Sequence, residues 1–347
     1  MLQAERDNNL DPSTFAGSID LVSEKLGGKV INASDEFFAE KENLLKPGRG
    51  VFIPDKYTDR GKWMDGWETR RKRVEGYDWC IIKLPYLGII RGVDIDTNHF
   101  LGNHPPYASI DVTYLANEDE FIDQANWTEV LPKSSLKQGS QNIFSIQSQE
   151  KCTYIRLNIY PDGGVARFRA YGHIVKDWSK LQANKEIIDL AAIENGGQVI
   201  AANDMFFGNK DNLIMPGRGV NMGDGWETRR KRGPGNDWVI IKLAKPGNLK
   251  KIEIDTAHYK GNYPDRCWLD GCYETSLDIN NLNWHKVKWN MILNETKLYA
   301  DKQHYFEEEI IDHEQVFTHV RLNIIPDGGV GRLRLHGMVI LNDKKKQ

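Results

Sequence analysis

Short apolar segments rich in β-branched residues recur along the chain, and turn-forming sequences separate them. Residues 78–84 read DWCIIKL and residues 237–243 read DWVIIKL, which is typical of buried β-strands. The sequence PDGG occurs at 161–164 and again at 326–329, where proline and Asp-Gly favour a tight reversal. Long helical periods are scarce, and the clearest candidate for a short helix is DEFFAEKENLL at 35–45. The pattern predicts an all-β fold.

The strand expected after each PDGG turn alternates between apolar and polar side chains. In the first, Phe168 and Ala170 fall on the core face, and Arg167, Arg169 and Tyr171 fall on the opposite face. Many short strands joined by Gly and Pro turns favour a jelly-roll β-sandwich. The same alternation follows the second turn, with Leu333 and Leu335 against Arg332, Arg334 and His336.

The chain is an internal duplication. IDLVSEKLGGKVI at 19–31 matches IDLAAIENGGQVI at 188–200 with an offset of 169 residues. The offset falls to 159 after extra residues around FIPDKYTDRGKW in the first copy, and DGWETRRKR is then identical at 65–73 and 224–232. Such repetition indicates two similar domains of ordinary size. We expect an N-terminal tail at 1–18, a first jelly-roll repeat at 19–176, a linker at 177–187 and a second jelly-roll repeat at 188–347.

Composition argues against several classes of protein. The 347 residues are 27% charged with a formal net charge of −3, whereas a dedicated nucleic-acid binder is usually basic. No segment approaches the roughly 20 apolar residues that a membrane span needs. The N-terminus shows no apolar signal segment, and no cysteine has a counterpart in the other repeat, which indicates reduced thiols. We expect a cytoplasmic protein without nucleic-acid or membrane partners.

The duplicated DGWETRRKR segment supplies the first candidate site. Arginine presents a planar fork that matches carboxylate or phosphate, and nearby Asp and Glu side chains accept N–H groups. The combination suits a small polar acid with amide or ureido arms. The alternatives are a solvated loop with ion pairs worth about 0–1 kcal/mol each, or a nucleic-acid contact through RRKR. The candidate substrate-binding residues here are Asp65, Arg70, Arg71, Asp224, Arg229 and Arg230.

The PDGGVxRxR motif has two interpretations that the sequence leaves open. It is a turn followed by the last strand, and so it can be scaffold alone. Its charged residues are also candidates for binding the same anion, because paired arginines match a carboxylate. Those residues are Asp162, Arg167, Asp327 and Arg332.

The motif IDTxH contains the only histidines at matched positions in the two copies, His99 and His258, each three residues after an aspartate. Histidine is the side chain best suited to move protons near neutral pH. The alternative is a structural histidine bonded to a backbone carbonyl. No HxH, HExxH or EF-hand spacing occurs, so we predict no metal or other cofactor, although the residues leave open a structural divalent cation in a loop.

The motifs LGGKVI, ASDEFF, PGRG, DGWETRR, DIDTNHFLGN and PDGGVARFRAYG, with their second-copy counterparts, resemble the allantoicase family over nearly the whole chain. The resemblance implies two discoidin-like, galactose-binding-type jelly rolls, hydrolysis of allantoate to ureidoglycolate and urea in purine degradation, and a homo-oligomer. It also implies an arginine fork on the substrate carboxylate and carboxylates that accept ureido N–H groups. The candidate acids and bases are Glu68, His99, Glu227 and His258.

The two copies are not identical at their polar positions. His304 aligns with Asn142, and His104 aligns with Tyr263, so one copy can be catalytic while the other supports assembly. The sequence leaves open whether the site lies within a repeat, between repeats or between subunits. The alternative function is a non-enzymatic tandem lectin-like module that binds a sugar or a small acidic metabolite.

Overall fold

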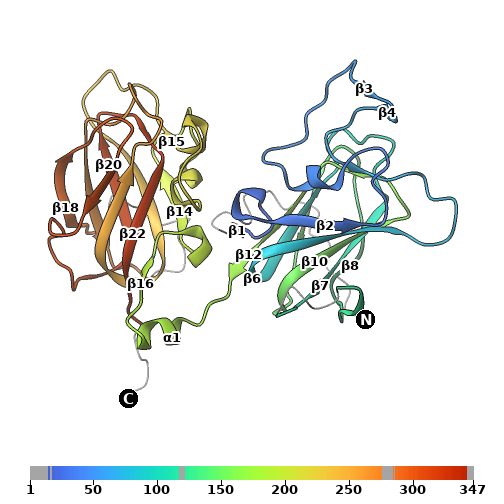
Figure 1. The fold of residues 1–347 in the computed structure, drawn as a ribbon, viewed down its shortest axis with the longest axis horizontal. Coiled ribbons are helices and arrows are strands. Elements are labelled where there is room, and N and C mark those ends of the chain that lie inside the picture. The colour runs from blue at the N-terminus through green and yellow to red at the C-terminus, as the bar shows by residue number, and fades with distance from the viewer. Residues whose placement is uncertain (1–14, 16–17, 117–121, 276–283, 285, 342–347) are drawn as a thin grey trace. The chain divides into compact units, whose positions relative to one another are not determined.

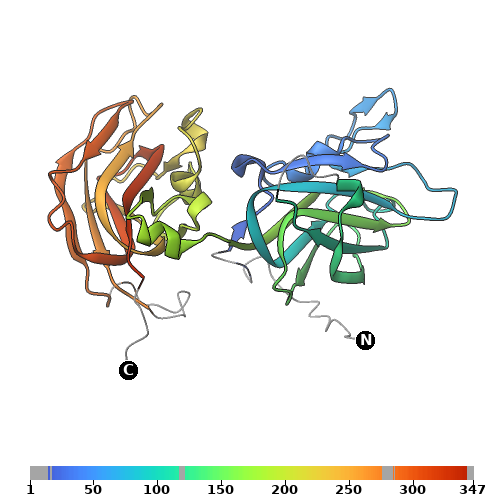
Figure 2. The same ribbon diagram turned by 60° about the horizontal axis from the view of Figure 1, so that its bottom comes forward.

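The chain folds into two compact units, residues 1–175 and 176–347. The computed structural model describes residues 15, 18–116, 122–275, 284 and 286–341. Each unit is built from β-strands packed in two layers (Figures 1 and 2). The prediction of two tandem, all-β jelly-roll sandwiches is confirmed. No helix in the described ranges is long and apolar enough to cross a membrane.

One long strand, β6 (Asp78–Asp96), organises the first unit. Its first half pairs mainly with β2 (Lys29–Ala33) and β10 (Lys151–Tyr160), and its second half pairs with β9 (Gln141–Ser145) and β12 (Arg167–Ile174). A single strand thereby enters both layers of the sandwich. The remaining strands of this sheet are β1 (Ile19–Asp20), β7 (Tyr107–Thr113) and β8 (Thr128–Ser135).

The second unit repeats this arrangement around β16 (Asp237–Asp255). The strand order β1-β12-β6-β10-β7-β8 of the first unit corresponds to β13-β22-β16-β20-β17-β18. Two further strands, β14 and β19, pair with β16 as β2 and β9 pair with β6. The bounds are β13 (Ile187–Asp189), β14 (Gln198–Ala202), β17 (Arg266–Cys272), β18 (Asn290–Lys297), β19 (Gln303–Phe306), β20 (Val316–Ile325) and β22 (Arg332–Val339).

Inward-facing apolar side chains form a separate core in each unit. In the first, Ile82, Ile95, Ile155 and Phe168 have no exposed surface. Burying such side chains stabilises a fold by about 25 cal/mol per Å² of apolar surface. The core of the second unit includes the matching strand residues, among them Ile241, Ile254, Val320 and Leu333.

Two small sheets hold the duplicated motifs together. In the first unit β5 (Trp67–Glu68) pairs with β11 (Gly164–Val165), and in the second β15 (Trp226–Glu227) pairs with β21 (Gly329–Val330). DGWETRRKR therefore lies against the PDGG turn in both repeats. Trp67 and Trp226 are fully buried, and each indole N–H donates to a backbone carbonyl.

The extra residues of the first copy form a hairpin of β3 (Tyr57–Thr58) and β4 (Gly61–Lys62). Figure 1 shows the hairpin projecting from the first unit. Helices are short. The 3-10 helices are η2 (Glu24–Leu26), η3 (Lys41–Leu45), η4 (Ile122–Gln124), η5 (Ile193–Asn195), η6 (Lys210–Ile214) and η7 (Met222–Asp224), and the α-helix is α1 (Trp178–Ala183).

One local expectation was wrong. The helix expected at 35–45 is only the 3-10 turn η3, because the Asp35 carboxylate binds the N–H groups of Phe37 and Arg70 and folds the start of the segment as a loop. The segment expected to be a linker contains α1. Asp177 caps this helix by accepting from the N–H of Lys180.

The N-terminal tail expected at 1–18 lies mostly outside the described residues. Phe15 is described, and its ring stacks on that of Tyr171, with 5.5 Å between the ring centroids.

Candidate functional site

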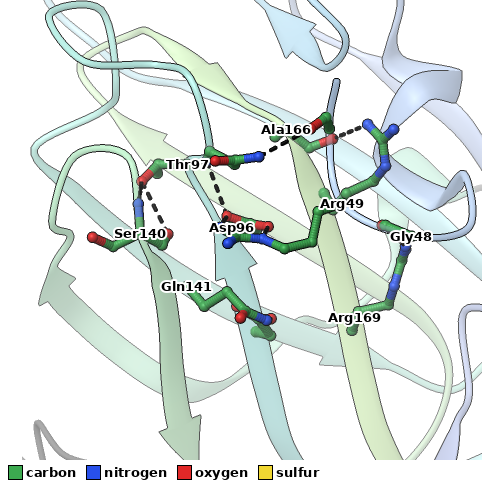
Figure 3. Close-up of polar contacts among 12 residues, drawn as sticks. Gly48, Arg49, Asp96, Thr97, Ser140, Gln141, Ala166 and Arg169 are labelled. Carbon is green, nitrogen blue, oxygen red and sulfur yellow. Dashed lines mark hydrogen bonds and ion pairs between the residues drawn. The ribbon is translucent and has the colours of Figure 1, made fainter. Parts of the chain in front are cut away.

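The PGRG segment at 47–50 lies across the end of β6, where Arg49 binds Asp96. Arg49 donates from Nε and Nη2 to the two carboxylate oxygens of Asp96, each at 2.8 Å. The Asp96 side chain is 3% exposed, whereas that of Arg49 is 49% exposed. Figure 3 shows this pair between Gln141 and Arg169. Arg49 is thus fixed at one edge of its guanidinium while the other edge faces solvent.

The same overlying loop explains why Asp94 and Asp96 are buried on the outer face of the sheet. Val93 and Ile95 point into the core, so both aspartates point away from it, under the loop. Asp94 accepts from Gln141 Nε2 at 2.7 Å, and its other oxygen is buried without a hydrogen-bond partner among the described residues. Burial raises the pKa of Asp94 to about 6, and neighbouring Asp96 adds to the rise.

Arg167 supports the loop from below. Its Nη2 lies 2.7 Å from Asp65 Oδ2 and its Nη1 donates to the Asp65 carbonyl at 2.9 Å, with both side chains under 10% exposed. Burial alone would raise the pKa of Asp65, but hydrogen bonds from Arg167 and the Val51 amide outweigh it and lower the pKa. Arg169 donates to the carbonyl oxygens of Lys46 and Gly48. Both arginines are therefore used to hold the PGRG segment.

His99 stands beside this segment in a strained conformation. Its φ of 67° is left-handed, which costs a non-glycine residue about 1–2 kcal/mol. The imidazole is exposed and stacks on Phe52, with 5.5 Å between ring centroids. Within the described ranges the ring nitrogens make no hydrogen bond. Asn98, the preceding residue, donates to the Gly50 carbonyl and so ties the IDTxH loop to PGRG.

The other candidates of the first repeat lie along DGWETRRKR. Glu68 accepts from Asn103 at 2.6 Å, and burial raises the pKa of its carboxyl. Arg70 is bound to Asp35, with Nη2 2.6 Å from the carboxylate, and its guanidinium lies over the ring of Phe37. The structure therefore uses Arg70 in a local ion pair at an exposed position.

The two remaining candidates of this repeat differ in their surroundings. Asp162 accepts the backbone N–H of Lys72 at 2.8 Å, which closes the motif against the PDGG turn. The backbone N–H groups of Arg70 and Lys72 both bind carboxylates, so the strand ends at Glu68. Arg71 is exposed and has no ion pair or hydrogen bond in the described part of the chain.

The second repeat has the same frame. Arg218 binds Asp255 at 2.7 and 3.2 Å, and Arg332 binds Asp224 at 2.8 Å. His258 is again left-handed, with φ of 70°, but its Nε2 is 2.8 Å from the carbonyl oxygen of Gly219. This histidine is therefore held by the PGRG segment that it adjoins.

The other second-repeat candidates mirror their counterparts. Asn262 donates to Glu227, and Arg229 binds Asp204 at 2.8 Å. Asp327 accepts the N–H of Lys231 at 2.7 Å. Arg230 is exposed, without an ion pair or hydrogen bond to any described residue.

Sequence reasoning missed three polar residues of the site, Arg49, Asp94 and Gln141, and their second-repeat counterparts Arg218, Glu253 and Gln303. The available signal was PGRG, which occurs unchanged at 47–50 and 216–219. The arginine of this motif needs a carboxylate partner. An aspartate at the end of the neighbouring long strand supplies it, Asp96 in the first repeat and Asp255 in the second.

The described residues include no group of three or more His, Cys, Asp or Glu side chains placed to hold a metal ion. The four cysteines, Cys80, Cys152, Cys267 and Cys272, are buried free thiols.

Comparison with known proteins gives consistent results. The family model described as "Allantoicase repeat" matches residues 19–175 and 188–340. The chain is 52% identical over 319 residues to "Probable allantoicase 1" of Burkholderia mallei, covering 92% of this chain and 94% of that protein. It is 47% identical over 336 residues to "Allantoicase" of Dictyostelium discoideum, covering 95% and 90%. The crystal structure of allantoicase from Saccharomyces cerevisiae superposes with a TM-score of 0.78 at 39% identity, covering 92% and 93%.

Proposed function

The chain belongs to the allantoicase family, and we propose that it carries out the family's reaction at the PGRG and IDTxH loops of its first repeat. The reaction is the hydrolysis of allantoate to ureidoglycolate and urea in purine degradation. Identity of 52% over 92% of the chain supports the enzyme assignment. The family membership does not favour a non-enzymatic sugar-binding module.

The reaction sets clear demands on a site. Allantoate has one carboxylate on a carbon that bears two ureido groups. Hydrolysis breaks one bond from this carbon to nitrogen, forms a bond from the same carbon to the oxygen of water, and transfers a proton from water to the departing urea. A positioned acid or base contributes about 10²–10⁴-fold to such proton transfers. The substrate carboxylate also needs a cationic partner.

The first repeat offers groups for each demand. The observation that carries the proposal is His99, a strained and exposed histidine whose ring nitrogens have no hydrogen-bond partner in the described residues. Backbone strain concentrates at functional positions. His99 is placed to move the proton, and the free edge of Arg49 can approach an anion. Glu68 is the second candidate base. It accepts a hydrogen bond from Asn103, which follows His99 in the same loop.

Arg167 and Arg332 have no direct role in this proposal. Each guanidinium is already bound to a buried or half-buried aspartate, and contact with substrate would break that pair. Arg70 and Arg229 are likewise bound to Asp35 and Asp204. Arg71 and Arg230 stay candidates for electrostatic attraction of the substrate.

The proposal extends to a cytoplasmic homo-oligomer that has no nucleic-acid or membrane partner and uses no cofactor. Four buried free thiols suit a reducing compartment. Exposed apolar side chains, such as Phe206 at 64% and Phe207 at 62%, suit a surface that another subunit covers. The mixed charge, with a net −3, suits a protein that does not bind nucleic acid.

The test is direct. Purified protein is incubated with allantoate, and urea and ureidoglycolate are measured before and after dialysis against a chelator. Release of both products in equal amounts is expected, with the rate unchanged by the chelator. Absence of product, with allantoate still binding by calorimetry, would remove the enzyme assignment. Loss of activity on chelation, restored by a divalent cation, would remove the cofactor-free part of the proposal.

A further inference from the structure

The first repeat contains a hairpin that the second lacks. The offset between the copies falls from 169 to 159 after Val51, so about ten residues have no counterpart in the second repeat. They form most of the β3–β4 hairpin, which projects from the first unit in both views (Figures 1 and 2). An exposed, two-stranded arm contributes little to the core, so its sequence is free to serve the site beside it.

The base of this hairpin stacks on the candidate site. The Lys62 ammonium lies 4.5 Å from the ring centroid of Phe52, and the Phe52 ring lies 5.5 Å from that of His99. Lys62 is exposed and has no acidic partner among the described residues. A cation held over an aromatic face keeps its charge while its position is restricted. The stack therefore places an uncompensated positive charge on the same aromatic ring that His99 contacts.

The arginines around this loop are either paired or matched in the second repeat. Asp65 binds Arg167 and Asp35 binds Arg70. Asp96 binds one edge of Arg49 and leaves the other free, but Asp255 binds Arg218 in the same way, so Arg49 does not distinguish the repeats. Arg71 is exposed in the first repeat, but Arg230 is equally exposed in the second, so this position does not distinguish the repeats. Lys62 does distinguish them, because it aligns with Asn221 at the offset of 159.

From this arrangement we propose that Lys62 binds the carboxylate of the substrate and that the hairpin makes the first repeat the active copy. The inference rests on the proposed function, because it names the anion-binding residue of that same site. An ammonium paired with a carboxylate in a partly covered position makes a charge-assisted hydrogen bond, stronger than one between neutral groups. Phe52 contacts both Lys62 and His99, so the anion-binding group and the proposed proton-transfer group are held by one ring.

The hairpin supplies its own matched control. Lys56 lies 3.7 Å from the ring centroid of Trp63, a cation–aromatic contact of the same kind on the same arm, but it does not touch Phe52. Lys62→Gln and Lys56→Gln remove the same charge from the same hairpin. Lys62→Arg keeps the charge. All three are made in the full chain, and thermal melting checks that each variant is folded.

The measurement is the KM and kcat for allantoate at two salt concentrations. Lys62→Gln is expected to raise KM about tenfold with kcat changed by less than about threefold, because a charged hydrogen bond common to ground and transition states is lost. Lys62→Arg should restore most of the loss. The KM of the wild type should rise with salt more than that of Lys62→Gln, since salt screens an exposed charge.

The outcomes separate the two proposals. An inactive wild-type protein overturns the proposed function and this inference with it. An active wild type with equal KM in Lys62→Gln and Lys56→Gln overturns the role of Lys62 alone. Failure of Lys62→Arg to restore KM also counts against a charge-based role.

Discussion

The two repeats have the same frame but use their histidines differently. In both, an arginine of PGRG binds the aspartate that ends the long strand, and a left-handed histidine follows three residues later. His258 is bonded to the carbonyl oxygen of Gly219, whereas His99 stacks on Phe52 and leaves its ring nitrogens exposed. The contacts that the repeats share form their common frame, and the contacts that differ are the ones on which the proposed function depends.

The two repeats also differ in the acid beneath the loop. The first has Asp94, and the second has Glu253, each bound by a glutamine at 2.7 Å. Asp94 is buried with one oxygen unpartnered in the described residues, whereas Glu253 is partly exposed. The longer side chain reaches solvent, and the shorter one cannot. Both repeats therefore keep the contact between the acid and a glutamine, but they differ in how far the acid is buried.

The largest expected difference between the repeats is catalytic. His99→Ala should lower kcat/KM for allantoate by about 10²–10⁴-fold, because the proton-transfer group is lost. His258→Ala should lower it by less than about tenfold, since that imidazole is bonded to the backbone. Steady-state urea release measures both. Equal losses of kcat/KM in the two variants would mean that both repeats contribute to catalysis. A larger loss in His258→Ala would assign the reaction to the second repeat.

A second experiment tests whether the buried arginine that binds an aspartate stabilises both repeats. Arg167→Met should lower the free energy of unfolding by about 3–5 kcal/mol, because the buried Asp65 carboxylate loses its partner. Arg332→Met should lower it by less, because the Asp224 carboxylate is half-buried. Calorimetry of the full chain should show one unfolding transition lowered in each variant.

The double variant Arg167→Met, Asp65→Asn is the control for that experiment. It should recover part of the lost stability, since the uncompensated charge is then gone. A loss below about 1 kcal/mol in either single variant would mean that the pair is not needed to hold its loop.

The smallest expected effect concerns pH. Burial raises the pKa of Asp94 to about 6 from 3.8, so the folded chain holds this proton more tightly than the unfolded chain. The resulting stabilisation is present below about pH 4 and is lost as the pH rises through 6, by about 3 kcal/mol at most. Asp94→Asn should remove that part of the decline, measured as the melting temperature from pH 4 to 8.

Asp20, whose pKa burial also raises to about 6, should keep a residual slope in Asp94→Asn. A pH profile of stability identical to that of the wild type would show that Asp94 does not titrate in this range.

The sequence predicted the architecture because its signals are local and repeated. Alternation after each PDGG turn placed Phe168 and Leu333 in the cores, and both are fully buried. Duplication then gave the second domain from the first. Such patterns report which face of a strand meets apolar neighbours, which is the main determinant of a sandwich.

The site was predicted less well because its partners are distant in sequence. For Arg167 the sequence left scaffold and anion binding open, and the structure shows it bonded to Asp65, 102 residues away. The sequence analysis did not single out Asp94, which is buried on the outer side of the sheet. A periodic pattern does not show what lies over the outer face. DGWETRRKR was prominent because it is identical in both copies, and most of that identity serves packing and loop closure.

The left-handed backbone at His99 and His258 has a consequence for any effort to improve this protein. At such a position glycine relieves the strain and so favours the fold over the native residue. A screen that rewards only thermal stability would therefore replace His99 early, and under the proposed function the more stable variants would have less activity. The left-handed backbone at this position therefore sets stability against activity. The histidine would be kept only where the screen also rewards turnover.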